Sequence, residues 1–206
     1  MAVWLLASVV AALASSLTLT AARVGNVYVP VGNDSFYHAR RILDTASDPA
    51  AFYQFDSKIH APEGSLLTWP WGYDYALAIL VKAGTALGLS NDPMAILAWI
   101  PVAALFINIG LLVLLARRLQ LTTWPTAIAA LCMALVPTTQ LMHGPGEVDH
   151  HFAELMFLLA SLTAGLFWLQ NPSSRRAAAT LGIVLGIAPA IHNALFILQL
   201  PLVGAL

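Results

Sequence analysis

The amino-acid sequence predicts an all-α fold, a polytopic membrane bundle of about five transmembrane helices with amphipathic helices in a long outer loop. Of the 206 residues, 59% are hydrophobic and 9% are charged, whereas about 25% of the residues of a soluble domain are charged. The mean hydropathy is +0.78. The charges are also segregated, because twelve of them lie in residues 23–92 and none lies in residues 1–22. These observations exclude a soluble globular domain.

Five stretches have the length and apolar composition of a membrane span, since a bilayer core of about 30 Å needs roughly 20 helical residues. They are residues 3–22, 94–116, 121–142, 152–170 and 178–200. No basic residue precedes the first stretch, and its end is a poor small-residue cleavage site. We therefore expect a retained first helix instead of a signal peptide.

The orientation of these spans is predicted from two arginine pairs, Arg117/Arg118 and Arg175/Arg176. Both pairs are cytoplasmic, as the positive-inside rule requires, if the loops 23–92 and 143–151 lie on the outer face. Segment 73–89 then lies on the membrane surface as an amphipathic helix. In the alternative topology this segment crosses the membrane, and Arg117/Arg118 lie outside.

Two elements are predicted within the outer loop. Residues 35–44 are expected to form a helix with Asp34 as its N-cap, and residues 62–72 to form turns. The single cysteine, Cys132, cannot form an internal disulfide, and a net charge of -1 offers no basic surface for nucleic acid. A disulfide scaffold and a nucleic-acid-binding protein are both excluded.

The densest cluster of ionisable residues is the stretch 144–154, at the outer mouth of a predicted span. With Asp149 as the N-cap and His151 in the first turn, a carboxylate oxygen and an imidazole nitrogen can converge on one ion. Ionisable groups at membrane depth are expensive and therefore suggest function. The structural alternative is that Asp149 only caps the helix and that the histidines are interfacial.

A second cluster, in residues 32–41, contains Asp34, which would share that ion with Asp149. The structural alternative for this cluster is a capped interfacial helix whose arginines lie near lipid phosphates.

A third stretch, residues 60–74, is typical of a turn-rich loop with aromatic membrane anchors, but His60 could complete the metal site. In the last span, His192 stands beside Asn193. We interpret His192 as part of a polar pair between helices.

Taken in order, these elements resemble a known family. They are a first helix, the loop start Asn33-Asp34-x-x-Tyr37-His38-x-Arg40, a Pro-x-Gly and Trp-Pro stretch, and Asp149-His150-His151 at the start of a later span. The order is similar to the N-terminal membrane region of the oligosaccharyltransferase catalytic subunit, especially its archaeal and bacterial single-subunit forms, in the GT-C superfamily. The resemblance implies a GT-C-like fold and a glycosyltransferase that moves a glycan from a polyprenyl-(di)phosphate carrier to asparagine of an acceptor polypeptide.

The resemblance also implies a divalent cation, most often Mn or Mg, with Zn as a further candidate. The implied metal ligands are Asp34, Asp149 and His151, with His60 as a candidate fourth, and Asp34 and Asp149 are the implied catalytic residues. The further substrate-binding candidates are Arg40, Arg41, His38, Glu147 and His150.

Two parts of the family pattern are missing from the sequence. The Trp-Trp-Asp acceptor motif has no counterpart, because the stretch Trp69 to Asp74 is only superficially similar. The catalytic glutamate of a later outer loop is absent as well. We therefore expect the chain to be the N-terminal part of a longer protein of a prokaryotic plasma membrane, with its site on the outer face, and to be inactive alone.

Two other functions remain open at this point. A related GT-C transferase would move a single sugar from polyprenyl phosphate to a lipid or polysaccharide, and a Trp-Trp-Asp motif further along the gene would argue against it. A metal or solute transporter is the alternative of another class. Transporters place polar residues near the bilayer midplane, whereas the ionisable groups of this sequence gather on one predicted outer face.

Overall fold

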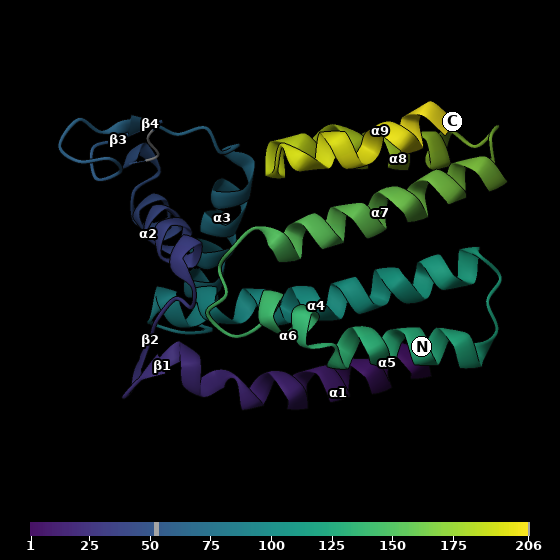
Figure 1. Ribbon diagram of the computed structural model, residues 1–206, viewed down its shortest axis with the longest axis horizontal. Helices are drawn as coiled ribbons and strands as arrows, with labels where there is room; N and C mark the ends of the chain where they lie inside the picture. The colour runs from purple at the N-terminus through teal and green to yellow at the C-terminus, as the bar shows by residue number, and fades with distance from the viewer. Residues whose placement is uncertain (52–53, 206) are drawn as a thin grey trace.

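The computed structural model describes residues 1–51 and 54–205, and most of the described residues are helical, which confirms the predicted helical class. The helices along the long axis are α1 (Ala2–Leu17), α4 (Pro93–Arg118), α5 (Thr123–Leu135), α7 (His151–Gln170), α8 (Arg175–Ile191) and α9 (Ala194–Ala205). They pack against one another in a bundle, while α2 (Asn33–Ser47) and α3 (Gly72–Ala86) lie at one end (Figure 1).

Among the described residues, α4 and α7 are the helices that are long and apolar enough to cross a membrane, judged by length and composition. The helices α1, α5 and α9 are apolar but shorter. The predicted arrangement of about five spans therefore stays a prediction.

Small side chains bring α1, α4 and α5 close together. Ala7 and Ala11 of α1 and Ala130 of α5 are fully buried, and they form one apolar cluster with Leu105 and Ile109 of α4. Alanine at a helix interface lets the backbones approach, which increases the van der Waals contact between helices.

Two stretches that we expected to be continuous helices are each divided into two. Residues 121–142 form α5 and a separate short helix, α6 (Pro137–Met142), because the residue before a proline is pushed out of the helical region. Residues 178–200 are divided between α8 and α9. Pro189 lies inside α8, and the helix ends at Ile191 because the next residue, His192, is extended. Both α8 and α9 pack on α7.

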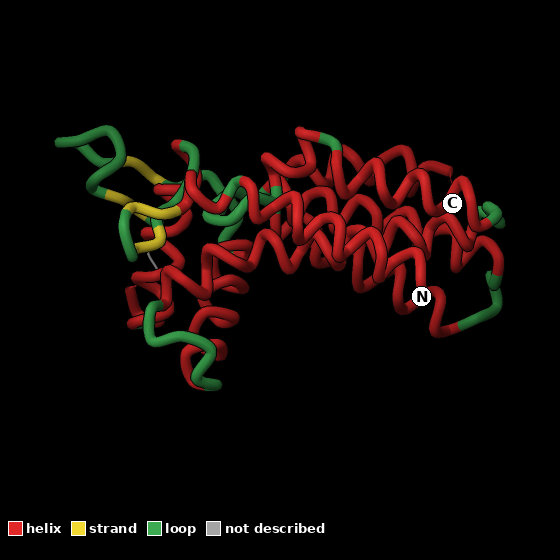
Figure 2. The backbone as a smooth tube through the Cα atoms, turned by 90° about the horizontal axis from the view of Figure 1, so that it is seen from below, coloured by secondary structure: helices red, strands yellow, loops and turns green. Residues whose placement is uncertain are grey.

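The polar segment between α1 and α4 forms the end of the molecule away from both termini (Figure 2). It contains the antiparallel pairs β1 (Arg23–Val24) with β2 (Val27–Tyr28) and β3 (Phe55–Asp56) with β4 (Ser65–Leu66). The short 3-10 turns are η1 (Leu19–Ala22) and η2 (Pro49–Ala51).

Within this segment, the helix expected over residues 35–44 is longer, and Gly32 occupies its N-cap position. The prediction that Asp34 caps the helix is therefore wrong, because the helical turn starts one residue earlier at Asn33 and Asp34 lies in the first turn. The segment expected over residues 73–89 is the helix α3, which lies beside α2 and not among the long helices (Figure 1).

The opposite end of the bundle carries the two arginine pairs. Nη1 of Arg118 donates to Oε1 of Gln170 at 3.2 Å, and Nε2 of Gln170 donates to the Arg118 carbonyl at 2.7 Å. These bonds join the C-terminal ends of α4 and α7, and α8 begins at the same end with Arg175 and Arg176. The polar segment and the basic pairs thus lie at opposite ends of the molecule.

Candidate functional site

The loop between α6 and α7 is fixed to the start of α2. The backbone N–H of Val31 donates to the Gly146 carbonyl, and the N–H of Gly146 donates to the Ala98 carbonyl, both at 2.9 Å. Gly146 has φ +82°, and a Cβ atom there would lie 2.7 Å from the Val29 carbonyl oxygen. Only glycine allows this close approach without strain, so the loop lies directly against the residues that lead into α2.

A buried cluster of charged groups joins α2 to α3. The carboxylate of Asp74, which is fully buried, accepts a hydrogen bond from Nδ1 of His38 at 2.7 Å and one from Arg41 at 2.8 Å. His38 and Arg41 are each 1% exposed. The adjacent Tyr73 donates through its hydroxyl to the Val148 carbonyl at 3.0 Å. The helix α3 therefore holds both α2 and the loop that carries Asp149.

Asp149 lies between two histidines. Its Oδ1 atom is 2.7 Å from Nδ1 of His150, and its Oδ2 atom is 3.4 Å from Nε2 of His151. Burial raises the pKa of Asp149, but the contacts with His150 and the charge of His151 outweigh burial and lower the pKa to about 2. The carboxylate is therefore ionised at neutral pH, as a metal ligand must be.

The prediction that Asp149 caps α7 is wrong. His150 occupies the N-cap position of that helix and makes no side-chain capping bond. The Asp149 carboxylate instead accepts from the N–H of His150, the next residue, at 2.7 Å. This local bond turns the carboxylate toward the histidines.

Glu154, one turn into α7, extends the cluster toward α9. Its carboxylate lies 2.7 Å from Nδ1 of His151 and makes a close contact with Nδ1 of His192. The ring of His192 stacks on that of His150, with the centroids 4.0 Å apart and the planes at 22°. His192 therefore forms a histidine cluster with His150 and His151. The predicted polar pair between helices is present, because the break between α8 and α9 brings His192 to Glu154 of α7.

Two sets of side chains could hold a metal ion within the described ranges 1–51 and 54–205. Each set brings its possible ligand atoms within 4.8 Å of one another. One set is His38, Asp149 and His150, and the other is His150, His151 and Glu154.

Asp34 and His60 belong to neither set. Asp34 is exposed in the first turn of α2, and its negative charge acts on the His151 imidazole. It also lines a cavity of about 350 Å³ together with Tyr37, His38 and Trp69. His60 is exposed in the loop between β3 and β4.

The other substrate-binding candidates already have partners. Arg40 pairs closely with Asp56, while the Arg41 guanidinium is buried against Asp74. Burial raises the pKa of Glu147, whose carboxylate accepts a 3.3 Å hydrogen bond from Ser35.

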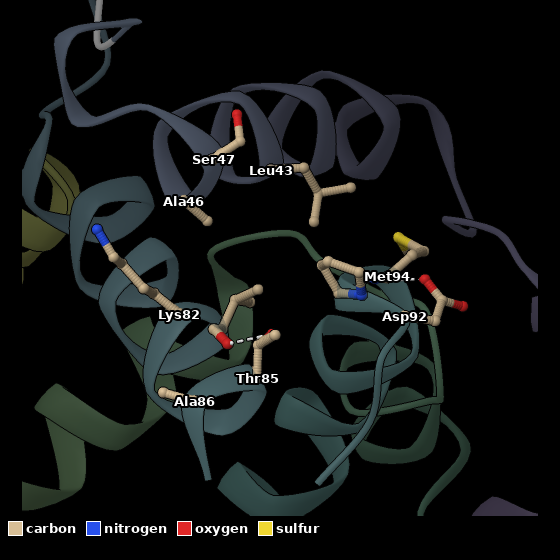
Figure 3. A pocket seen from close by; sticks show the side chains of 10 residues that line it. Leu43, Ala46, Ser47, Lys82, Thr85, Ala86, Asp92 and Met94 are labelled. Carbon is tan, nitrogen blue, oxygen red and sulfur yellow. Dashed lines mark hydrogen bonds between the residues drawn. The ribbon is translucent and has the colours of Figure 1, made fainter. Parts of the chain in front are cut away.

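A separate apolar pocket of about 460 Å³ lies between α2, α3 and the start of α4 (Figure 3). Aliphatic side chains such as Leu43 and Met94 line it, and the charged residues on its wall are Lys82 and Asp92. Asp92 caps α4 by accepting from the N–H of Met94. This pocket contains no metal-ligating group of the histidine cluster.

Asp74, Glu154 and His192 are site residues that the sequence analysis did not assign. The sequence feature that could have identified Asp74 is its position as an acid on the same apolar face of α3 as Tyr73 and Leu77. The signal for His192 was the proline-marked break in the last apolar stretch. Neither signal says which distant residue the side chain meets.

Comparison with known proteins gives structural neighbours only. No family model matches the sequence, and no curated protein matches it. The chain is similar to the archaeal oligosaccharyltransferase AglB from Archaeoglobus fulgidus, solved with an inhibitory peptide and a dolichol-phosphate. The TM-score is 0.80 and the identity 25%, over 99% of this chain and 25% of that chain.

Two further structures of the Archaeoglobus fulgidus enzyme give the same result. The complex with Zn and sulfate has a TM-score of 0.79 and 25% identity, over 98% of this chain and 26% of that chain. The form tethered to an acceptor peptide containing the NVT sequon has a TM-score of 0.81 and 24% identity, over 99% of this chain and 25% of that chain. The chain thus spans about a quarter of the length of these neighbours, which support a relationship to the oligosaccharyltransferase family.

Proposed function

Because this chain shares its fold with part of an archaeal oligosaccharyltransferase, we propose that it is the membrane part of a glycosyltransferase of that type. The reaction moves a glycan from a polyprenyl-(di)phosphate carrier to an asparagine of an acceptor polypeptide. The observation that carries the proposal is the Asp149–His151 pair at one end of a bundle that matches the neighbour over 99% of the chain, with the charge of Asp34 acting on the same imidazole.

The neighbours support the choice of donor and acceptor. One was solved with a dolichol-phosphate, which is a polyprenyl phosphate, and another with a tethered acceptor peptide. The exposed Asp34 borders a cavity with Tyr37 and Trp69 on its wall. An extended peptide or a sugar has room there, because aromatic walls and a few polar groups are typical of ligand pockets.

The residues of the site fit a divalent cation. Asp149 offers an ionised oxygen, His151 a half-exposed imidazole, and Asp34 a further carboxylate whose charge already acts on that imidazole. Mixed oxygen and nitrogen ligands suit Mn or Zn, and carboxylates also suit Mg. A bound cation supplies Lewis-acid stabilisation of the leaving phosphate.

The chain's own groups have separate tasks in this proposal. Asp34, on the cavity wall, accepts a hydrogen bond from the acceptor amide and orients its nitrogen toward the sugar. Asp149 keeps its negative charge at neutral pH because its pKa is about 2. Glu154 fixes the orientation of His151 through the 2.7 Å contact with its Nδ1, as a carboxylate behind a ligating histidine does.

We place the protein in a membrane with this site on the outer face. The long helices present aliphatic side chains outward, among them Leu5, Val9, Ile107, Ile183 and Ile197. The arginine pairs lie at the end opposite the site, which suits the positive-inside rule.

The test is glycan transfer by the full-length protein in membranes, with a lipid-linked glycan and a peptide containing a glycosylation sequon. We expect Asp34→Asn and Asp149→Asn each to lower transfer by about 100-fold or more, and a chelator to do the same. Asp48→Asn is the matched control, because this exposed acid ends α2 about 20 Å along the helix from Asp34. Full transfer by both site variants would overturn the proposal.

A further inference from the structure

Two buried ring nitrogens of the histidine cluster lack a hydrogen-bond partner among the residues that the structure describes. They are Nε2 of His38 and Nδ1 of His150. The two side chains are 1% and 6% exposed. Buried polar atoms in native proteins are almost always paired, so Nε2 of His38 calls for a missing partner, whereas Nδ1 of His150 has Oδ1 of Asp149 at 2.7 Å.

The orientation of His38 indicates what kind of partner is missing. Its Nδ1 atom is held by Asp74, and Asp74 is in turn held by Arg41. With the Nδ1 proton donated to the carboxylate, Nε2 presents a lone pair and not a hydrogen. A buried carboxylate that fixes a histidine in this way is the usual support for a metal-ligating imidazole.

The position of His38 brings that lone pair to two further ligands. Ligand atoms of His38, Asp149 and His150 lie within 4.8 Å of one another. The rings of His38 and His150 are 5.6 Å apart at 67°, so they meet edge to face instead of stacking. Nδ1 of His150 is 2.7 Å from Oδ1 of Asp149 but is not aligned for a hydrogen bond.

We propose that His38, Asp149 and His150 form an inner metal site, with Asp74 as the carboxylate that positions His38. The position proposed above for the divalent cation, between Asp34, Asp149 and His151, is called the outer site. The inner site uses Oδ1 of Asp149, whereas the outer site uses Oδ2, which faces His151. The inner site rests on the proposed function and adds a second ion position behind the outer site, with which it shares only Asp149.

The ligands of the inner site select the metal. Two imidazoles and one carboxylate favour Zn²⁺, Co²⁺ or Ni²⁺ over Mg²⁺ or Ca²⁺. Around a tetrahedral ion, ligands at bond lengths of 2.0–2.1 Å are about 3.4 Å apart. Side chains within 4.8 Å of one another reach that spacing by moving about 1 Å.

The experiment uses the purified full-length protein in detergent, stripped of metal and then titrated with Co²⁺ and with Zn²⁺. Binding is measured by calorimetry, and the visible absorption of Co²⁺ reports a site with few, low-symmetry ligands. The wild type should bind Co²⁺ with strong absorption. His38→Gln should weaken that binding at least 10-fold and remove the absorption.

Asp74→Asn tests the positioning role, since loss of a supporting carboxylate typically weakens metal binding 10- to 100-fold. Because this variant leaves Arg41 with one partner fewer, the readout is the rise in Tm on adding Zn²⁺ and not the Tm itself. The controls are Asp34→Asn and His60→Gln, which change exposed residues outside the inner site and should keep the Co²⁺ absorption.

Three results would overturn the inner site: a wild type without Co²⁺ absorption, His38→Gln with wild-type affinity and spectrum, or loss of the absorption in Asp34→Asn. These results are separable from the proposed function, because glycan transfer that depends on Asp34 can persist without a His38-dependent ion. Conversely, intact Co²⁺ binding without any transfer would reject the glycosyltransferase and keep the inner site.

Discussion

The two carboxylate oxygens of Asp149 face different histidines, Oδ1 facing His150 and Oδ2 facing His151. A ligand that binds only the folded state raises stability by mass action, about 2.7 kcal/mol at a concentration 100 times Kd. We predict that Asp149→Asn abolishes the rise in Tm that Mn²⁺ or Zn²⁺ produces in the full-length protein. Asp48→Asn should keep that rise, and an equal rise in both variants would contradict the metal assignment.

A second prediction at this scale concerns His143, which is fully buried behind the site. Its Nδ1 donates to the Thr139 carbonyl, and its Nε2 accepts from the Asn108 amide, each at 2.8 Å. The bond from Asn108 needs the neutral ring, because a protonated Nε2 cannot accept, and burial lowers the pKa of His143 from 6.5 to about 4. Between these values the unfolded chain binds more protons, so stability falls as the pH drops.

The expected loss from His143 is about 3 kcal/mol by pH 4. It is measured as the unfolding midpoint in detergent at a series of pH values from 7 to 4, in the wild type and in His143→Gln. The variant starts less stable, but its midpoint should fall less over this range because the buried imidazole is gone. Parallel curves for the two proteins would show that His143 does not carry this dependence.

The residues of the site differ in how far the sequence predicts them. Asp149 and His151 stand out because ionisable side chains are rare in an apolar stretch. Asp74 and His192 do not, since their roles depend on contacts with His38 and Glu154 at distant positions. Helix caps are predicted poorly for a related reason, as the first turn of α2 begins before Asp34 and not after it.

At the scale of elements, hydropathy predicts where the long helices are but not where they end. The backbone break at Pro137 and the break between α8 and α9 interrupt runs that are uniformly apolar. Hydrophobicity is insensitive to such breaks, because the side chains on either side are equally apolar. The consequences are large, since the second break brings His192 into the site.

The loop that carries Asp149 gives a prediction at this scale. Gly146→Ala puts a Cβ 2.7 Å from the Val29 carbonyl oxygen at a residue with φ +82°. The φ alone costs about 1–2 kcal/mol, and overpacking adds about 1–3 kcal/mol. We expect a clear loss of thermal stability together with weaker metal binding, as the loop moves away from α2.

Gly25→Ala is the matched control for this change. Gly25 has φ +61° in the turn between β1 and β2, and a Cβ there meets nothing within 4 Å. The Gly25→Ala variant should lose only the stability that the positive φ costs, about 1–2 kcal/mol, with metal binding unchanged. Equal effects of the two variants would mean that the close approach at Gly146 is unimportant.

At the scale of the whole molecule, the separation of the arginine pairs from the polar segment predicts a topology in the membrane. Cys132 is the single cysteine and is exposed, so Cys132→Ser provides a background without thiols. In that background, Ser47→Cys at the end of α2 and Ser173→Cys between α7 and α8 place one exposed thiol at each end of the bundle. A membrane-impermeant maleimide should label position 47 in intact cells and position 173 only after permeabilisation.

Labelling of both positions from the same side would contradict the orientation, and labelling of position 173 alone would invert it. The result also tests α3, because a crossing helix would place positions 47 and 173 on the same side of the membrane. The lateral position of α3 beside α2 predicts opposite sides.

The break between α8 and α9 has a consequence for biogenesis. The residues of the site are synthesised at widely separated times. The start of α2 is made first, and Glu147, which Ser35 contacts, follows 112 residues later. His192 arrives last, and its ring covers His150. A nascent chain that ends before His192 therefore carries the proposed metal ligands but lacks the ring that stacks on His150.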